Sequence, residues 1–120
     1  MKSAIDALYQ LLSLSCFDYH DETVCQNQFE ECLKDAGIQY HREFKLVNGI
    51  IDFYFPKSGL GLEIKASKAW SKMKVYRQCE RYLEDARLSG LILATGKSQG
   101  MPNSINEKPV KVLNLGVAFL

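Results

Sequence analysis

The sequence has no long apolar run and almost no net charge, and the first of these absences excludes a class of protein. No stretch approaches the roughly 20 apolar residues that a membrane-spanning helix needs. The N-terminal segment carries Asp6 and Gln10 where the core of a secretory signal is apolar, so we expect no signal peptide. We therefore expect a cytoplasmic protein with no membrane partner. The formal net charge of +1 does not by itself indicate a nucleic-acid-binding protein.

The four cysteines include no C-x-x-C pair. Cys25 and Cys32 are seven residues apart on one predicted helix, which separates them by about 10 Å and prevents a disulfide between them. We expect reduced thiols in the core. A zinc site that uses His20 or His41 is the alternative, but the spacing of the cysteines does not favour it.

The chain has no internal repeat and no low-complexity stretch, so residues 1–120 are expected to form one domain. Charge is divided unevenly along it. Residues 1–36 hold seven acids against two lysines, a net −5, whereas residues 65–81 hold six bases against one acid, a net +5. Such an asymmetry predicts a basic surface stripe of the kind that a phosphate backbone contacts.

A hairpin over residues 50–66 carries the most informative polar residues. Residues 50–56 and 60–66 are expected to be strands, and the Pro, Ser and Gly between them favour a turn. The turn places Asp52 opposite or nearly opposite Glu63, while Glu63 and Lys65 share one face. Two carboxylates roughly 5 Å apart repel each other, which raises one pKa or requires a cation such as a hard divalent metal ion. The alternative is a plain amphipathic hairpin with a solvated Glu63–Lys65 pair, but Asp52 interrupts an otherwise apolar run and argues against it.

The pattern Ile51-Asp52 followed by Glu63-Ile64-Lys65 resembles the PD-(D/E)XK nuclease superfamily, and the resemblance spans residues 22–95. It implies an α/β fold with a restriction-endonuclease-like αβββαβ core, in which helices flank a mixed central sheet. It also implies that Asp52, Glu63 and the main-chain carbonyl of Ile64 hold Mg²⁺, with Mn²⁺ as a substitute, and that Lys65 is catalytic.

These nucleases commonly contribute a glutamate from the first core helix to the metal site. On the helix expected over residues 22–36, Glu22 lies within about 20° of Phe29 and Leu33 in the apolar stripe, which makes it the chosen acid. Glu30, rotated by about 80° from Glu22, is its rival. The alternative role of Glu22 is to complement the helix dipole in the first turn.

A helix is expected over residues 71–88, with Gln78 and Tyr82 as i, i+4 neighbours. This Gln-x-x-x-Tyr pair is similar to a motif in several branches of these nucleases, and a Gln soon after Glu-x-Lys resembles the virus-type replication-repair branch. The resemblance implies that Gln78 positions the site. The alternative is a plain amphipathic helix with a solvated basic face. The expected apolar stripe is Met73, Tyr76, Cys79, Leu83 and Ala86, and the expected nucleic-acid contacts are Lys68, Lys72, Lys74, Arg77, Arg81 and Tyr82.

The remaining segments complete the expected order of elements. A helix over residues 3–15, in an additional N-terminal segment 1–17, precedes the core, and Asn48-Gly49 predicts a turn after a first strand at 40–46. Leu91–Thr95 is expected to be a central buried strand, residues 96–108 a loop, and residues 110–120 to hold a last strand. Leu11 and Leu14 point away from the apolar face of the first helix, which favours a homodimer. The alternative is that these two leucines meet the loop over residues 96–108.

The leading hypothesis is a divalent-metal-dependent endonuclease, a hydrolase of phosphodiester bonds with DNA favoured over RNA. Small nucleases of this resemblance, including Holliday-junction resolvases, are often dimers. Two alternatives remain: a nucleic-acid-binding module that keeps the fold without catalysis, and a structural or partner-binding protein in which the motif is fortuitous.

Overall fold

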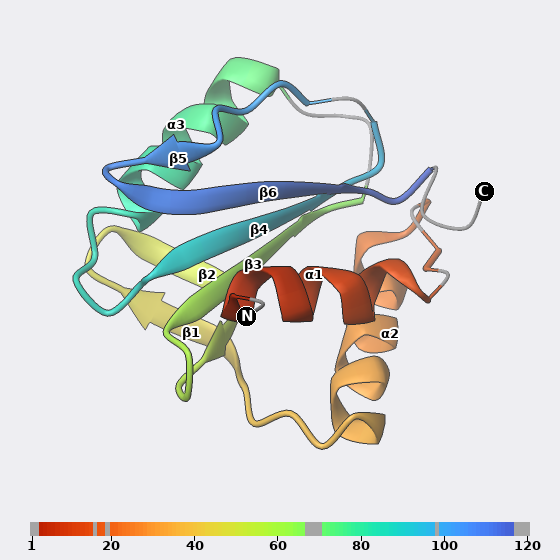
Figure 1. Cartoon of the computed structure of the whole chain (residues 1–120). Helices are drawn as coiled ribbons and strands as arrows, with labels where there is room; N and C mark the ends of the chain where they lie inside the picture. Colours follow the sequence, from red (N-terminus) through yellow and green to blue (C-terminus); the bar gives the residue numbers. More distant parts are fainter. Residues whose placement is uncertain (1–2, 16, 19, 67–70, 98, 117–120) are drawn as a thin grey trace.

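A mixed sheet of six strands forms the centre of the computed structural model, which describes residues 3–15, 17–18, 20–66, 71–97 and 99–116. The spatial order of the strands is β1-β2-β3-β4-β6-β5 (Figure 1). The first three strands pair antiparallel, β3–β4 and β4–β6 pair parallel, and β5–β6 is antiparallel. The strands are β1 (His41–Leu46), β2 (Gly49–Phe55), β3 (Leu60–Lys65), β4 (Gly90–Thr95), β5 (Ser104–Ile105) and β6 (Lys108–Asn114).

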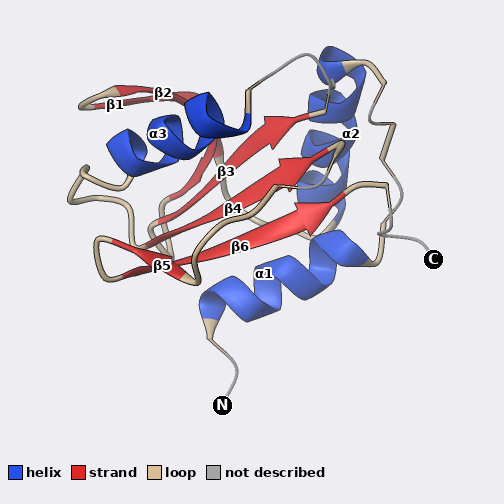
Figure 2. Ribbon diagram, turned by 90° about the horizontal axis from the view of Figure 1, so that it is seen from above, coloured by secondary structure: helices blue, strands red, loops and turns tan. Residues whose placement is uncertain are grey.

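Three helices cover the two faces of the sheet. α1 (Ala4–Ser13) and α2 (Glu22–Asp35) lie on one face, and α3 (Lys72–Tyr82) lies on the other (Figure 2). Each face has its own apolar cluster. Phe29, Phe53 and Leu62 belong to the cluster under α1 and α2, whereas Cys79 and Leu93 belong to the cluster under α3. The α/β class with a mixed sheet and flanking helices is therefore confirmed. No helix within the described residues is long and apolar enough to span a bilayer.

Local signals in the sequence define the ends of α2. The side chain of Asp21 accepts a hydrogen bond from the N–H of Val24 at 3.0 Å, which satisfies one of the free donors of the first turn. At the other end Gly37 has φ 70°, and the N–H of Ile38 donates to the carbonyl of Leu33 at 3.0 Å. This is a Schellman motif, for which glycine is favoured because it has no Cβ to clash in the left-handed region. The prediction of a helix that ends before Gly37 is confirmed.

The predicted strands of the hairpin region are confirmed within a residue or so at each end. The Asn48-Gly49 turn joins β1 to β2, as its composition predicts. β4 is buried at every position and pairs with β3 on one side and β6 on the other, so it is the central strand that its continuous apolar run predicts.

The predicted length of α3 is wrong, and its predicted apolar stripe is confirmed only at Cys79 and Leu83. The helix ends at Tyr82 rather than at residue 88, because the carbonyl of Leu83 accepts hydrogen bonds from Asn106 Nδ2 at 3.1 Å and Lys108 Nζ at 2.8 Å. Contacts from the β5–β6 hairpin thus replace the next helical turn. The buried stripe is Val75, Cys79 and Tyr82, and Met73 is 56% exposed. Of the residues in the predicted stripe, Met73, Tyr76 and Ala86 are not in the buried core.

Residues 96–108 are not a loop throughout. β5 lies within this range and β6 begins at Lys108. Asn106 and Glu107, at the turn between them, have φ 54° and 64°. Positive φ at both central residues is typical of the type I′ turn, whose twist matches that of the flanking strands. The sequence signal was weak because glutamate rarely adopts this conformation, and pairing with β6 overrides that preference.

The described cysteines are free thiols, as expected. Cys25 and Cys79 are fully buried, and burial is the main cause that raises the pKa of each to about 12. Cys32 is partly buried, and Cys16 lies outside the described residues. Thiols with so high a pKa remain protonated at neutral pH and pack as small apolar groups.

Candidate active site

The site is built where the β2–β3 ladder ends. The paired positions of this ladder run from Phe55 opposite Leu60 to Phe53 opposite Leu62. The next position in the same register places Asp52 beside Glu63, as the hairpin pattern predicts.

At that position the carboxylates replace the main-chain ladder. The N–H of Asp52 donates to Glu63 Oε1 at 3.2 Å, and the N–H of Ile64 donates to Asp52 Oδ2 at 2.8 Å. The N–H and C=O of one strand residue point to the same side of the strand, so the carbonyl of Ile64 also points toward β2. Two carboxylates and one main-chain carbonyl therefore face the point where the two strands separate.

An irregularity in the hairpin turns Asp52 into this position. Side chains two apart on a strand normally share a face, yet Ile51 packs in the cluster under α3 and Phe53 in the cluster under α2. Glu43, which stands across from Asp52 in the β1–β2 register, has φ 54°. A residue other than glycine rarely adopts this left-handed conformation. The alternation of faces is thus broken at Asp52, which lets its carboxylate point between the strands.

Lys65 and Glu63 form an ion pair on the α3 face of the sheet. Lys65 Nζ lies 3.3 Å from Glu63 Oε2, and the side chains are 22% and 5% exposed. Burial, followed by the negative charge of Asp52, raises the pKa of Glu63 well above its ordinary value. The pKa of Asp52 is also raised, chiefly by burial. The site therefore tends to hold a proton between its two acids when no cation is bound.

Gln78 and Tyr82 are joined as the motif predicts. Gln78 Nε2 donates to the Tyr82 hydroxyl at 2.8 Å, and that hydroxyl donates to the carbonyl of Ile50 at 2.7 Å. Gly49 has φ 143°, and a Cβ built there would lie 2.8 Å from the Tyr82 ring, so glycine permits the close approach. These contacts attach α3 to the start of β2, two residues before Asp52.

The expected role of Tyr82 as a nucleic-acid contact is wrong for this structure. Tyr82 is 2% exposed and belongs to the apolar cluster under α3, and burial raises its pKa. A phenol this deeply buried cannot stack on a base. The sequence pattern could not distinguish Tyr82 from Tyr76 as the buried ring, because the two lie three residues on either side of Cys79.

The two candidate acids of α2 have different surroundings. Glu22 is exposed, and its negative charge is close enough to contribute to the raised pKa of Asp52. Glu30 accepts hydrogen bonds from the Tyr40 hydroxyl at 2.7 Å and from Arg42 Nη1 at 3.1 Å, and the bond from Tyr40 is the main cause of its lowered pKa. Glu30 is thus engaged by Tyr40 and Arg42. Of the two acids, Glu22 is the one whose charge acts on Asp52. Within the described residues, no three Asp, Glu, His or Cys side chains are grouped as metal ligands.

The residue of α2 that does contact the site is Gln26. Its Nε2 donates to Asp52 Oδ1 at 3.3 Å. The site residues predicted on this helix were acids, and Gln26 was not among them. The available signal was its spacing, because Gln26 is the i+4 neighbour of Glu22 and adjoins the apolar stripe.

The basic residues expected to contact nucleic acid lie on the exposed side of α3. Lys74, Gln78 and Arg81 fall within about 60° of arc on a helix of 3.6 residues per turn, and Arg77 adjoins them. Glu80 lies about 60° from Arg77, on the side away from Gln78. Lys74 and Arg81 are therefore on the flank that also carries Gln78, whereas Arg77 lies between this flank and Glu80. Lys72 is exposed at the start of the helix, and Lys68 lies outside the described residues.

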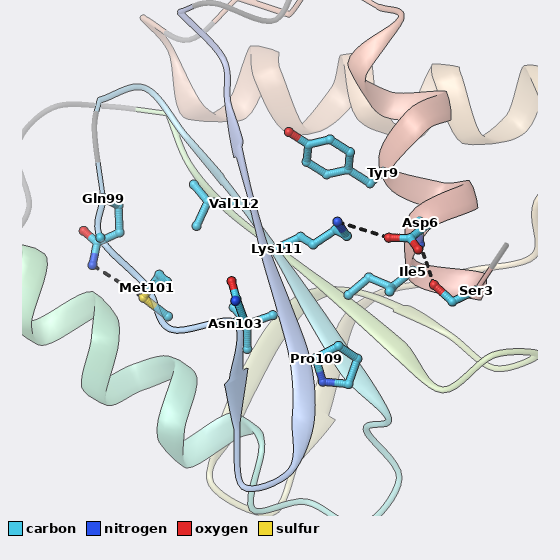
Figure 3. Close-up of a pocket in the computed structure, with 12 residues that line it drawn as sticks. Ser3, Ile5, Asp6, Tyr9, Gln99, Met101, Asn103, Pro109, Lys111 and Val112 are labelled. Atoms are coloured by element: carbon cyan, nitrogen blue, oxygen red, sulfur yellow. Dashed lines mark hydrogen bonds and ion pairs between the residues drawn. The ribbon is translucent and has the colours of Figure 1, made fainter.

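A cleft of about 730 Å³ lies elsewhere, between α1 and the β5–β6 side of the sheet (Figure 3). Lys111 lies 3.1 Å from Asp6, and its Nζ is 5.3 Å from the centre of the Tyr9 ring. The Oε1 atom of Gln99 is buried and accepts no hydrogen bond within the described part of the chain. None of the residues predicted for the site lines this cleft. Because its charged groups pair with each other, the cleft does not indicate a class of ligand.

The donor set at the strand ends fits a hard divalent cation. Carboxylate and main-chain carbonyl oxygens are the ligands that Mg²⁺ and Mn²⁺ prefer, and Asp52, Glu63 and Ile64 present these groups together. Burial raises the pKa of both acids. A bound cation would stabilise the two ionised carboxylates and so lower both pKa values. Comparison of the chain with models of protein families, with curated proteins and with solved structures finds no match.

Proposed function

We propose that this protein is a divalent-metal-dependent endonuclease that hydrolyses phosphodiester bonds, with DNA as the favoured substrate. The observation that supports this most is the reciprocal pairing of Asp52 and Glu63 at the end of the β2–β3 ladder, with Lys65 3.3 Å from Glu63. The proposal includes the finer fold assignment, in which α2, β1–β3, α3 and β4 form a restriction-endonuclease-like core.

Asp52, Glu63 and the carbonyl of Ile64 would hold Mg²⁺, with Mn²⁺ as a substitute, and Glu22 would be the additional acid from α2. The ion would polarise the scissile phosphate and lower the pKa of water in the site. Each carboxylate oxygen has two lone pairs, so one that accepts a protein hydrogen bond retains capacity for a cation.

Lys65 would act as an electrostatic catalyst. Its ammonium group is held beside Glu63 on the α3 face and its side chain is 22% exposed, which leaves it accessible to a substrate phosphate. A fixed positive charge in a partly buried site stabilises the negative charge that develops as a phosphodiester bond is cleaved. Gln78 would position the site through Tyr82 and the start of β2.

The flank of α3 that carries Lys74, Arg77 and Arg81 would contact the nucleic-acid backbone, together with Lys72 and Lys68. Such phosphate contacts orient the substrate but carry no sequence information. The resemblance of the sequence pattern to the nuclease superfamily favours DNA over RNA.

A second candidate is a nucleic-acid-binding module on the same fold without catalysis. The observation that favours it is that protein groups already engage all four carboxylate oxygens. Ile64 and Gln26 donate to Asp52, while the N–H of Asp52 and the ammonium group of Lys65 contact Glu63. Groups satisfied in this way form a stable polar network without an added ion.

Titration calorimetry with Mn²⁺ distinguishes the two candidates. The nuclease proposal predicts heat of binding for the wild-type protein and none for Asp52→Ala. It also predicts cleavage of plasmid, linear or branched DNA in Mg²⁺ that a chelator stops. A folded wild-type protein that binds DNA but neither binds Mn²⁺ nor cleaves would establish the binding module instead.

A further inference from the structure

Asp52 is in contact with α2 as well as with β3. Gln26 Nε2 donates to Asp52 Oδ1 at 3.3 Å, while the N–H of Ile64 donates to Asp52 Oδ2 at 2.8 Å. The two oxygens of one carboxylate thus have donors from two different elements. Contacts on both oxygens limit rotation of the carboxylate about its Cβ–Cγ bond.

The direction of the Gln26 amide follows from its other neighbour. Arg42 of β1 places Nη2 3.3 Å from Gln26 Oε1. A guanidinium group has donors only, so the side of the amide that faces Arg42 must be the oxygen. The NH₂ group is then directed at Asp52. The contact pattern therefore assigns Gln26 as a donor to Asp52, not as an oxygen ligand for a metal ion.

Arg42 is itself held in place by α2 and by the residue before β1. Its Nη1 donates to Asn27 Oδ1 at 2.9 Å and to Glu30 Oε1 at 3.1 Å, and the Tyr40 hydroxyl donates to Glu30 Oε2 at 2.7 Å. The side chains of Arg42 and Glu30 are 27% and 25% exposed, so this contact is partly shielded from water. Tyr40 and Arg42 both donate to Glu30, which holds Arg42 in place. From Arg42 the donors run in one direction, through Gln26 to Asp52.

We infer that Gln26, oriented by Arg42, is a positioning residue that holds the Asp52 carboxylate for the cation of the proposed site. The inference rests on the proposed function, because it concerns the same carboxylate. Groups that hydrogen-bond a ligating carboxylate orient it before the ion arrives, and their loss typically costs about 10–100-fold in metal affinity. Gln26 would thus act on the metal through Asp52 without touching it.

The test measures Mn²⁺ affinity by calorimetry in the absence of nucleic acid, on full-length variants whose circular dichroism and unfolding midpoint match the wild type. Gln26→Leu removes the donor but retains a good helix former. We expect it to weaken Mn²⁺ binding by about 10-fold or more. Asn27→Ala is the matched control, because it removes another contact of Arg42 but leaves the bond to Asp52 in place. Its affinity should stay within about two-fold of the wild type.

The role of Arg42 is tested by a double-mutant cycle. If Arg42 acts by orienting the amide of Gln26, then Arg42→Met should weaken Mn²⁺ binding in the wild-type background but have little further effect once Gln26 is leucine. A purely structural role for either residue would change the unfolding midpoint without this coupling. If Gln26→Leu does not fold, Gln26→Met serves as the second variant.

The outcomes separate this inference from the proposed function. A wild-type protein that binds no Mn²⁺ refutes the metal site itself. A wild-type protein that binds Mn²⁺ with the same affinity as folded Gln26→Leu retains the metal site and overturns the positioning role. Additive losses in the cycle overturn the assignment of Arg42 as the group that orients Gln26.

Discussion

Asp52 and Glu63 accept hydrogen bonds from each other's strands, at 3.2 Å from the N–H of Asp52 to Glu63 and at 2.8 Å from the N–H of Ile64 to Asp52. The main-chain donors at the end of the ladder are thereby satisfied by two acids that repel each other. This arrangement connects the stability of the protein to the protonation of its candidate site.

We expect Glu63→Gln to reduce the pH dependence of stability in metal-free protein. Burial and the Asp52 charge raise the pKa of Glu63, so the folded state binds more protons than the unfolded state from about pH 4.3 up to that raised pKa. Stability then falls as pH rises through this window, by at most about 1.4 kcal/mol per pH unit for one group. Glutamine does not titrate, so the variant should be more stable than the wild type at pH 8. Urea unfolding from pH 5 to pH 8 with a chelator present measures this.

Glu31→Gln is the control for that experiment, because Glu31 is an exposed carboxylate on α2. It should leave the pH profile of stability unchanged. A Glu63→Gln protein that is less stable than the wild type at pH 8 would contradict the raised pKa and indicate a structural role for the Glu63–Lys65 ion pair.

Neutralising Lys74, Arg77 and Arg81 should weaken DNA binding and flatten its dependence on salt. Each phosphate contact contributes about 0.9 to the slope of log K against log salt on duplex DNA, so loss of all three should reduce the slope by roughly two to three. Fluorescence anisotropy at several salt concentrations measures the slope. The control replaces Lys34 and Lys57, which are exposed but lie outside α3. An unchanged slope in the α3 variant would place the nucleic-acid surface elsewhere on the protein.

Asp85 should stabilise the β1–β2 hairpin, and this stabilisation should be lost at acid pH. Its buried carboxylate accepts hydrogen bonds from the N–H of Val47 at 2.9 Å and from Arg87 Nη2 at 2.8 Å. The bond from the Arg87 side chain is the main cause of its lowered pKa. A carboxyl group with a lowered pKa in the folded state contributes stability above about pH 4, and the contribution is lost as pH falls further. Asp85→Ala should cost about 1–3 kcal/mol at pH 7 and less at pH 2.

Chemical denaturation at the two pH values tests this prediction. Glu84→Ala is the neighbouring control, because Glu84 is exposed although it accepts a hydrogen bond from Asn48. Its effect should stay within about 0.5 kcal/mol. Equal losses of stability for Asp85→Ala at pH 7 and pH 2 would show that the carboxylate charge is not what stabilises the hairpin.

The three antiparallel strands β1, β2 and β3 were predictable because the local signals at their two turns agree with each other. Asn48-Gly49 determines the turn before β2, and the turn after it sets the register that brings Asp52 beside Glu63. Gln78 and Tyr82 were predictable as a pair because i, i+4 spacing on a helix is independent of the rest of the fold.

The features that were missed depend on contacts between distant segments. The early end of α3 follows from Asn106 and Lys108, which are more than twenty residues further along the chain. The contact of Gln26 with Asp52 requires α2 to lie against the end of β2, and no periodicity within either segment indicates it. The break in side-chain alternation at Asp52 is likewise unpredictable, because it accompanies the positive φ of Glu43 on the neighbouring strand.

α1 carries apolar side chains on its outer side as well as on the side that faces the sheet. Ile5, Leu8 and Leu12 are buried against the sheet, whereas Leu14 is 85% exposed and Leu11 is partly buried. Leu11 lines an apolar groove of about 380 Å³, and none of the described residues in the segment 96–108 lines it. The other lining residues are Ala4, Ala7, Leu8, Gly37, Ile38, Gln39, Phe55, Lys57, Ser58 and Leu60.

A helix with apolar side chains on its outer side is stabilised when a second surface covers them, and a two-fold contact between copies of the chain would do so. We therefore expect a dimer by light scattering at micromolar concentration, and a monomer for the double variant Leu11→Glu, Leu14→Glu. Val24→Glu is the control, because Val24 is also exposed, at 41%, but lies on α2. A wild-type monomer refutes the prediction. A dimer that persists in the double variant would place the interface away from α1, since two buried glutamates would be too costly to desolvate there.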